Sequence, residues 1–225
     1  MLWPGHRARE VAGTAFTSPS AAWAGDRSAA AFTAVAADGR AYAAWGAQFL
    51  SEGGDVGPAF HQVAVRPAGA ARFLRAQLLD RAPPGSGVDP PELVLGPTPT
   101  VAWSRFEGMT ARVRVAVADS TGRFGAMQEL SSPGADDRLG DLAASTDGRR
   151  LAVWETGGDP SRVRAAVAPP GGRFGPPEDV SAGGNAFFPR AALDRRTGAA
   201  TVVWLDSIGG LPGMGATLQA SRRDP

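Results

Sequence analysis

Four tryptophans recur along the chain, each at the end of a short apolar run. They are Trp45, Trp103, Trp154 and Trp204, which lie 58, 51 and 50 residues apart. A phenylalanine precedes each tryptophan by 29 or 30 residues, and these are Phe16, Phe73, Phe124 and Phe174. A repeat of about 50 residues in a chain rich in strand-like runs indicates successive sheet modules that bury their faces against each other. This period constrains the fold more than any single motif does.

Composition limits the classes of protein to which the chain can belong. The hydrophobic fraction of 43% and the charged fraction of 20% are typical of globular proteins. The net charge is +1, and the charges are scattered along the chain, so nothing indicates nucleic-acid binding. The absence of cysteine excludes disulfides and thiolate metal sites. No apolar run approaches the roughly 20 residues that a membrane span needs, and we expect none.

Each module divides into four strands. In the third module, residues 139–145 and 149–154 flank Asp147-Gly148, and an Asp-Gly pair between apolar runs predicts a tight hairpin. Asp38-Gly39 and Thr197-Gly198 take the same place in the first and last modules. An alternating strand over 162–167, a second turn and a short outer strand complete the unit.

A four-stranded antiparallel unit of about 50 residues is the blade of a β-propeller. An immunoglobulin-like sandwich would space the tryptophans at twice this interval. We therefore expect an all-β, single-domain propeller of about four four-stranded blades. A partial blade would cover 1–28, and full blades would cover about 29–80, 91–131, 138–181 and 187–225. The tryptophans are expected to lie between blades, and the alternative is an aromatic platform for a ligand.

The strand count allows two ways of closing the propeller. Residues 8–12 and 19–23 read as strands before the first full module, and the last module has only three strands, the final one at 216–222. Strand 19–23 could complete the last blade of a closed four-bladed ring. Alternatively, the chain is an arc of a larger ring, which would leave one blade uncovered and favour self-association.

The run from Ser145 to Trp154, Ser-Thr-Asp-Gly-Arg-Arg-Leu-Ala-Val-Trp, resembles the Ser-Pro-Asp-Gly-Lys-x-Ile-Ala-Phe signature of TolB-type (WD40-like) propeller repeats. Residues 37–45 resemble it more loosely. The resemblance implies a propeller whose innermost strand is 139–145 in this module, a location outside the cytoplasm, and binding to other proteins. Residues 1–7 lack the apolar core of a secretion signal, so a cytoplasmic location stays open.

The loops that follow each tryptophan vary in length, and variable loops on a rigid scaffold commonly bind ligands. The longest of these loops has its extra residues at 48–61. The next module has a polar and aromatic run, 105–107, after its own tryptophan. We predict that these loops bind a protein or a glycan, the alternative being an insertion that covers a neighbour. The predicted binding residues are Phe49, Glu52, Asp55, Phe60, His61, Arg105, Phe106 and Glu107.

The links between modules repeat a polar position. Its members are Asp26, Asp89, Asp137 and Asn185. Asx side chains commonly cap turns by bonding nearby backbone, which is the structural interpretation. The other interpretation is a ring of oxygens at the channel mouth that holds calcium, a cation that takes six to eight oxygen ligands. We expect no other cofactor.

Signs of catalysis are few. Propeller sialidases resemble the chain in fold class only, and they use a tyrosine nucleophile. The single tyrosine, Tyr42, lies in an apolar strand, and the two histidines, His6 and His61, are too few for a zinc centre. We assign no catalytic residue and expect a non-catalytic binding module. A glycoside-processing enzyme with a channel site and a structural arc of a larger ring are the alternatives.

Overall fold

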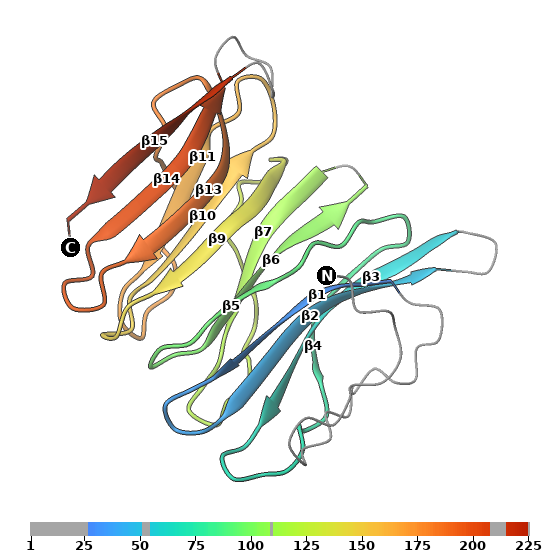
Figure 1. The fold of residues 1–225 in the computed structure, drawn as a ribbon. Coiled ribbons are helices and arrows are strands. Elements are labelled where there is room, and N and C mark those ends of the chain that lie inside the picture. Colours follow the sequence, from blue (N-terminus) through green and yellow to red (C-terminus); the bar gives the residue numbers. More distant parts are fainter. Residues whose placement is uncertain (1–26, 51–54, 109, 208–214, 225) are drawn as a thin grey trace. The chain divides into compact units, whose positions relative to one another are not determined.

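A computed structural model describes residues 27–50, 55–108, 110–207 and 215–224. In these ranges the chain forms fifteen strands in four antiparallel sheets (Figure 1). The described part contains no helix long and apolar enough to cross a membrane. The chain divides into two compact units, residues 1–91 and residues 92–225.

The first unit contains one four-stranded sheet, in which strands adjacent in sequence are paired. Its strands are β1 (Arg27–Val35), β2 (Ala41–Leu50), β3 (Val56–Arg66) and β4 (Gln77–Ala82). The turn between β1 and β2 is the predicted Asp38-Gly39 hairpin. Gly39 has φ 83°, and Asp38 Oδ1 accepts a hydrogen bond from the Arg40 amide at 3.0 Å. Tyr42 and Trp45 of β2 are buried.

The second unit contains three sheets, which again pair strands in chain order. Its first sheet has strands β5 (Glu92–Val94), β6 (Thr100–Glu107), β7 (Thr110–Val117) and β8 (Gln128–Glu129). Its second sheet has strands β9 (Asp137–Ala144), β10 (Arg150–Thr156), β11 (Val163–Ala168) and β12 (Glu178–Asp179). Its third sheet has strands β13 (Asn185–Leu193), β14 (Ala200–Ser207) and β15 (Ala216–Arg223).

These strands confirm the all-β composition, the four-stranded modules and the three-stranded last module. The strands of the four sheets span 27–82, 92–129, 137–179 and 185–223. The predicted strands at 8–12 and 19–23 lie outside the described residues, as does the predicted partial blade at 1–28 apart from Arg27 and Ser28, which belong to β1. That the whole chain forms one domain stays a prediction.

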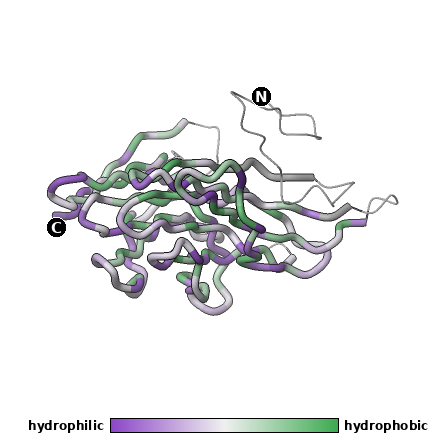
Figure 2. The backbone as a smooth tube through the Cα atoms, turned by 90° about the horizontal axis from the view of Figure 1, so that it is seen from below, coloured by the Kyte–Doolittle hydropathy of each residue, from purple (hydrophilic) through white to green (hydrophobic). Residues whose placement is uncertain are grey.

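The two tryptophans at the sheet interfaces of the second unit lie where the repeat predicts them. Trp154 is fully buried in a cluster that includes Val113 and Leu130 of the preceding sheet. Trp204 is buried against Leu151 of the sheet before its own. A buried tryptophan removes about 150–250 Å² from water, on the order of 4–6 kcal/mol as an upper bound. Figure 2 shows that hydrophobic and hydrophilic stretches alternate along the backbone.

The predicted hairpin turns of the second unit form as expected. Asp147 Oδ1 accepts a hydrogen bond from the Arg149 amide at 3.0 Å, and Gly148 has φ 94°. A positive φ is strained for residues other than glycine, so the Asp-Gly pair determines where this hairpin turns. In the last module Asp194 Oδ1 accepts a bond from the Thr197 amide at 2.7 Å, and Gly198 has φ 76°.

Candidate functional site

Three charged residues occupy the same register position on the inner strands of the second unit. Glu92 of β5 pairs with Ala102, Asp141 of β9 with Val153, and Arg190 of β13 with Val203. Each of these three partners directly precedes a repeat tryptophan. The propeller repeat therefore places two carboxylates and one guanidinium at equivalent positions of consecutive innermost strands. We call Glu92, Asp141 and Arg190 the inner-strand triad.

The members of the triad lie within electrostatic reach of one another. Burial raises the pKa of the Glu92 carboxyl, the negative charge of Asp141 raises it further, and Arg190 opposes both effects. A carboxyl with a raised pKa holds its proton to a higher pH than a free glutamate does. Glu92 is therefore the member best suited to donate a hydrogen bond or a proton.

Asp141, by contrast, is used to hold the backbone. Its Oδ1 accepts a hydrogen bond from the Leu142 amide at 2.8 Å, and its Oδ2 accepts one from the Ala191 amide at 2.9 Å. The second bond joins β9 to β13 of the next sheet. Arg190 also joins these strands, because its Nη1 donates to the carbonyl oxygen of Gly140. Two members of the triad thus connect adjacent sheets.

An exposed aromatic side chain lies near the start of β13. Phe188 is 68% exposed, and its φ of 53° is left-handed, which is uncommon for a residue other than glycine. Glu155 Oε2 accepts a hydrogen bond from the Phe188 amide at 2.9 Å, and the Phe187 ring lies 6.4 Å from the Phe188 ring between centroids. The structure therefore holds a large apolar side chain in water on a strained backbone, which is typical of functional sites.

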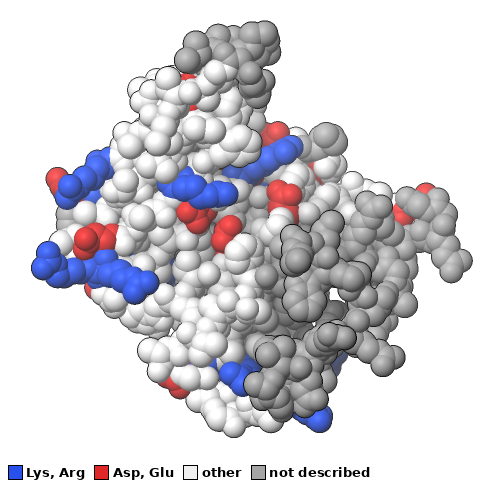
Figure 3. Space-filling view, in the orientation of Figure 1, with Lys and Arg blue, Asp and Glu red and all other residues white. Residues whose placement is uncertain are grey.

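Further aromatic and charged residues lie at the corresponding ends of strands in the preceding two sheets. Arg138 of β9 is the strand partner of Glu155, and its guanidinium lies 5.6 Å from the centroid of the Phe106 ring. We call the set Phe106, Arg138, Glu155, Phe187 and Phe188 the aromatic surface. It consists of residues from the ends of β6 and β10 and from the starts of β9 and β13. These ends carry the loops after the tryptophans and the links between modules. On the face drawn in Figure 3, basic and acidic side chains are interspersed.

Of the predicted binding residues in the first unit, two have described surroundings. The Phe60 ring lies 5.6 Å from the Arg81 guanidinium, and His61, 3% exposed, has its Nε2 3.1 Å from the carbonyl oxygen of Asp89. Asp55 is exposed. Glu52 lies outside the described residues, and so does the side chain of Phe49. The buried His61 therefore contacts the backbone of the link between the first two modules. A role of these residues in ligand binding stays a prediction.

The predicted residues of the second unit lie together at the end of β6. Arg105 and Glu107 form an ion pair at 3.4 Å, and Glu107 lies 3.9 Å from Arg112 across the hairpin. Phe106 contacts Arg138, as described above. The predicted run is therefore an ordered hairpin end, and one of its members belongs to the aromatic surface.

The strand registers show which polar residues hold equivalent positions in the links between modules. Asn185 Oδ1 accepts a hydrogen bond from the Ser161 amide at 2.9 Å, and Asp136 Oδ1 accepts one from the Ala111 amide at 2.8 Å. Asp136, one residue before Asp137, is thus the counterpart of Asn185. Both side chains bond the backbone at the start of a third strand or just before it, which fits the structural interpretation although the bond is not to the residue two positions on.

Asp137 itself is buried beside Trp154. Burial raises the pKa of the Asp137 carboxyl, and the Ser131 hydroxyl, Arg164 and the Trp154 indole oppose this rise. Asp137 Oδ2 and Trp154 Nε1 are both buried without a hydrogen-bond partner at bonding distance. Asp26 lies outside the described residues. Within the described ranges no three His, Asp or Glu side chains are grouped closely enough to hold a metal ion, and the calcium ring stays a prediction.

Sequence reasoning did not find the triad or Phe188. The triad becomes visible only when the inner strands are aligned through their pairing with the tryptophan strands. One signal was available, because Asp141 interrupts an otherwise apolar run from Leu139 to Ala144. For Phe188 the signal is Pro189, since a proline within a strand indicates an edge or a bulge, and β13 has a bulge between Phe187 and Arg190.

No protein-family model matches the sequence, and the comparison with curated proteins gives no match. Among solved structures, an α-L-arabinanase from Penicillium chrysogenum in complex with arabinobiose is similar over 84% of this chain and 64% of its own, at 13% identity and a TM-score of 0.53. A Hadza microbial sialidase is similar over 86% of this chain and 44% of its own, at 12% identity and a TM-score of 0.56.

A protein of unknown function from Dyadobacter fermentans is similar over 84% of this chain and 51% of its own, at 13% identity and a TM-score of 0.53. These similarities show the fold, and it is the predicted all-β propeller type, as in the propellers of glycoside hydrolases. The chain spans between 44% and 64% of the length of these three structures.

Proposed function

We propose that the chain is a non-catalytic propeller module that binds a glycan through its aromatic surface. The observation that carries the proposal is the exposed Phe188 on a left-handed backbone that Glu155 holds in place. Apolar sugar faces stack on aromatic rings, and charged side chains beside the ring can bond hydroxyl groups. Arg138 supplies such a donor next to Phe106.

Binding is favoured over catalysis by the state of the carboxylates. Glycoside hydrolysis in most families needs two carboxyl groups that can take part in the reaction. Both oxygens of Asp141 accept backbone hydrogen bonds, and one oxygen of Glu155 does the same. These acids therefore hold backbone amides of β9 and β13.

The test measures capture of the full chain on a glycan array, followed by calorimetric titration of any saccharide that binds. Phe188→Ala should weaken binding at least tenfold, because the ring supplies the stacking area. Met127→Ala is the control, since Met127 is also exposed, at 44%, and precedes the outer strand β8, whose Gln128 pairs with Val115 away from the aromatic surface. Absence of any saccharide binding, or equal affinity in both variants, would reject the proposal.

A second candidate is a glycoside-processing enzyme that uses the inner-strand triad. The raised pKa of Glu92 favours it, because a general acid must keep its proton near the working pH. Hydrolysis of a panel of chromogenic glycosides tests this function. Activity that disappears in Glu92→Gln and persists in Phe188→Ala would establish it in place of the binding module.

The assignment to TolB-type repeats is also a proposal. It is supported by Asp147 and Gly148, which form the tight hairpin that the repeat signature requires. We propose with it a location outside the cytoplasm. Fractionation of cells that produce the chain from its natural gene would test this, and recovery in the cytoplasmic fraction alone would contradict it.

A further inference from the structure

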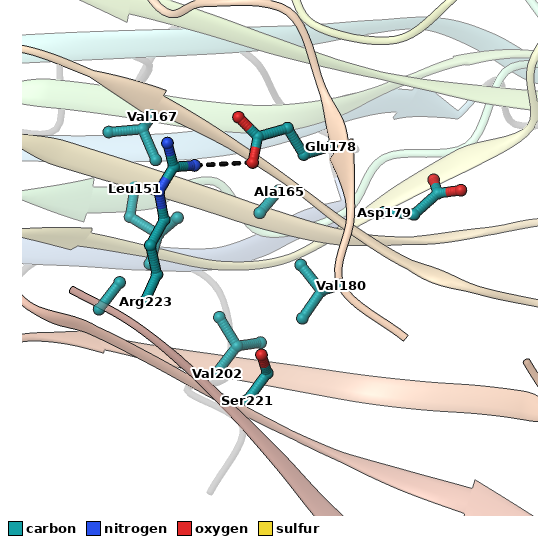
Figure 4. A pocket seen from close by; sticks show the side chains of 10 residues that line it. Leu151, Ala165, Val167, Glu178, Asp179, Val180, Val202, Ser221 and Arg223 are labelled. Carbon is teal, nitrogen blue, oxygen red and sulfur yellow. Dashed lines mark hydrogen bonds and ion pairs between the residues drawn. The ribbon is translucent and has the colours of Figure 1, made fainter. Parts of the chain in front are cut away.

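A groove opens between the last two sheets of the second unit, on the side of their outer strands. It is a cavity of about 140 Å³ lined mainly by small and branched apolar side chains (Figure 4). Its lining residues are Leu151, Ala165, Val167, Glu178, Asp179, Val180, Ala200, Val202, Ser221 and Arg223. None of these residues is aromatic. A cavity of roughly 150 Å³ is large enough to hold a benzene ring.

The preceding interface in the same unit shows what occupies the equivalent place. There the side chain of Phe174, 5% exposed, packs in a cluster that joins the first two sheets of the unit. Five other members of this cluster are Val115, Leu130, Ala152, Ala166 and Ala168. The Arg150 guanidinium covers the Phe174 ring, with its carbon 5.5 Å from the ring centroid.

The groove is lined by the counterparts of these five residues. Strand pairing and position relative to the repeat tryptophans identify the counterparts as Ala165, Val180, Val202, Ser221 and Arg223. Ala200 takes the place of Arg150, since each lies four residues before its tryptophan. The groove therefore corresponds to the place that Phe174 occupies at the preceding interface. No described residue fills it.

The filled interface also has a polar side chain that bonds the backbone of Phe174, and the groove has a polar side chain at the equivalent position. At the filled interface, Gln128 Nε2 donates to the carbonyl oxygen of Phe174 at 2.7 Å, and the Phe174 amide donates to Gln128 Oε1 at 3.2 Å. The counterpart of Gln128 is Glu178, which pairs with Ala165 as Gln128 pairs with Val115. Glu178 now forms an ion pair with Arg223 at 2.7 Å across the opening of the groove (Figure 4).

The strand next to the groove has a free edge within the described part of the chain. The third strands β3, β7 and β11 each pair with a fourth strand, whereas β15 pairs only with β14. Residues Ala216 to Arg223 of β15 are exposed apart from the half-buried Ser221. An extended segment can add to such an edge through main-chain hydrogen bonds, while a pocket beside it selects a side chain.

We propose that this groove and edge bind an extended segment of a partner protein that carries a phenylalanine. The segment lies antiparallel to β15 as a fourth strand. Its phenylalanine, placed before that strand as Phe174 is placed before β12, enters the groove. Its backbone amide bonds to Glu178. This site is separate from the aromatic surface and does not depend on the proposed function.

The experiment uses the full chain and a fluorescent peptide with the sequence of residues 171–181, which occupies the filled interface. Fluorescence anisotropy should show saturable binding. The same peptide with alanine in place of its phenylalanine should bind at least tenfold more weakly. Equal binding of the two peptides, or no binding of either to any form of the chain, would overturn the proposal.

Two variants of the chain separate occupation of the groove from general damage. Ser221→Phe places a ring in the groove and should abolish peptide binding. Ala220→Phe is the matched control, because Ala220 pairs with Val203 on the opposite face of the sheet. Thermal unfolding of both variants checks the fold. Loss of binding in both folded variants would contradict a site in the groove.

A third variant tests whether the chain fills its own groove. Phe16 lies outside the described residues and belongs to the same phenylalanine repeat as Phe174. If the unaltered chain does not bind the peptide and the Phe16→Ala chain does, residues of the chain itself are the occupant, and the partner proposal is overturned. Equal binding by both chains supports the partner proposal.

Discussion

Glu155 follows Trp154 directly and accepts a hydrogen bond from the backbone amide of Phe188 in the next sheet, at 2.9 Å. Ser104 holds the corresponding place after Trp103, and its Oγ accepts a bond from the Leu139 amide at 3.0 Å. The residue after the repeat tryptophan therefore holds the inner strand of the following sheet at both interfaces of the second unit. At the second interface the same bond also holds the exposed Phe188.

Replacement of Glu155 by alanine should weaken this connection. The loss of one hydrogen bond is expected to lower the free energy of unfolding by about 0.5–1.5 kcal/mol. Because the bond holds the left-handed residue, saccharide binding at the aromatic surface should fall as well. Urea unfolding and calorimetric titration measure the two effects. Glu155→Gln keeps an acceptor oxygen and should retain most of both, and an equal loss in the two variants would contradict this role.

The hydroxyls of Ser131 and Ser181 make a repeated internal bond. Each accepts a hydrogen bond from a buried third-strand amide, that of Val113 at 2.8 Å and that of Val163 at 3.0 Å. Ser131→Ala and Ser181→Ala should each lower the free energy of unfolding by about 1–3 kcal/mol, because a buried amide loses its partner. Chemical denaturation of the two variants is the measurement. A loss below about 0.5 kcal/mol in both would mean that water replaces the hydroxyl.

The close approach of β9 and β13 depends on Gly140. A Cβ atom at this position would lie 2.5 Å from Pro189 Cγ and 2.8 Å from the Pro189 carbonyl oxygen. Gly140→Ala should therefore separate the two inner strands and lower the free energy of unfolding by about 1–3 kcal/mol. Gly183→Ala is the control, since no atom lies within 4 Å of a Cβ there. Similar stability of the two variants would contradict the close contact.

Features that depend on local sequence could be predicted, whereas features that depend on the pairing of distant strands could not. The hairpins were predictable because Asp147-Gly148 and its counterparts are local signals that need no partner strand. The burial of Trp154 and Trp204 was predictable from the period, because every sheet must cover its neighbour. Glu92 and Arg190 were not, since their shared position depends on pairing between distant strands.

The link position shows a similar limit. Spacing in the sequence aligned Asp137 with Asn185, which are 48 residues apart, but strand pairing relates Asp141 to Arg190 and Arg138 to Phe187, each 49 residues apart, so Asp136 is the true counterpart. A shift of one residue reverses the direction of a side chain in a strand. The result is that Asp136 bonds a neighbouring strand while Asp137 is buried against Trp154.

The buried carboxyl of Asp137 should make stability depend on pH. Its pKa is raised in the folded state, chiefly by burial, so the folded chain binds the proton more tightly than the unfolded chain does. The corresponding stabilisation is fully present below the unfolded pKa and is lost as the pH rises through the folded pKa. Asp137→Asn has no charge at this position, so its free energy of unfolding should fall less between acidic and neutral pH.

Urea unfolding of the unaltered chain and of Asp137→Asn over that pH range measures the difference. Asp224→Asn is the control, because Asp224 is an exposed carboxylate that pairs with Arg222 and lies outside this site. Parallel pH profiles of the unaltered chain and Asp137→Asn would show that the carboxyl of Asp137 is not desolvated in the folded protein.

Truncation of Trp154 tests the role of the repeat itself. The side chain is fully buried in the cluster between two sheets, together with Val113 and Leu130 of the preceding sheet and Leu142 of its own. Trp154→Ala should lower the free energy of unfolding by about 3–5 kcal/mol, because it leaves a cavity that the flanking strands cannot close. Trp154→Phe keeps part of the contact and should cost less. Denaturant unfolding of both variants is the measurement, and a near-neutral alanine variant would mean that the sheets associate without the indole.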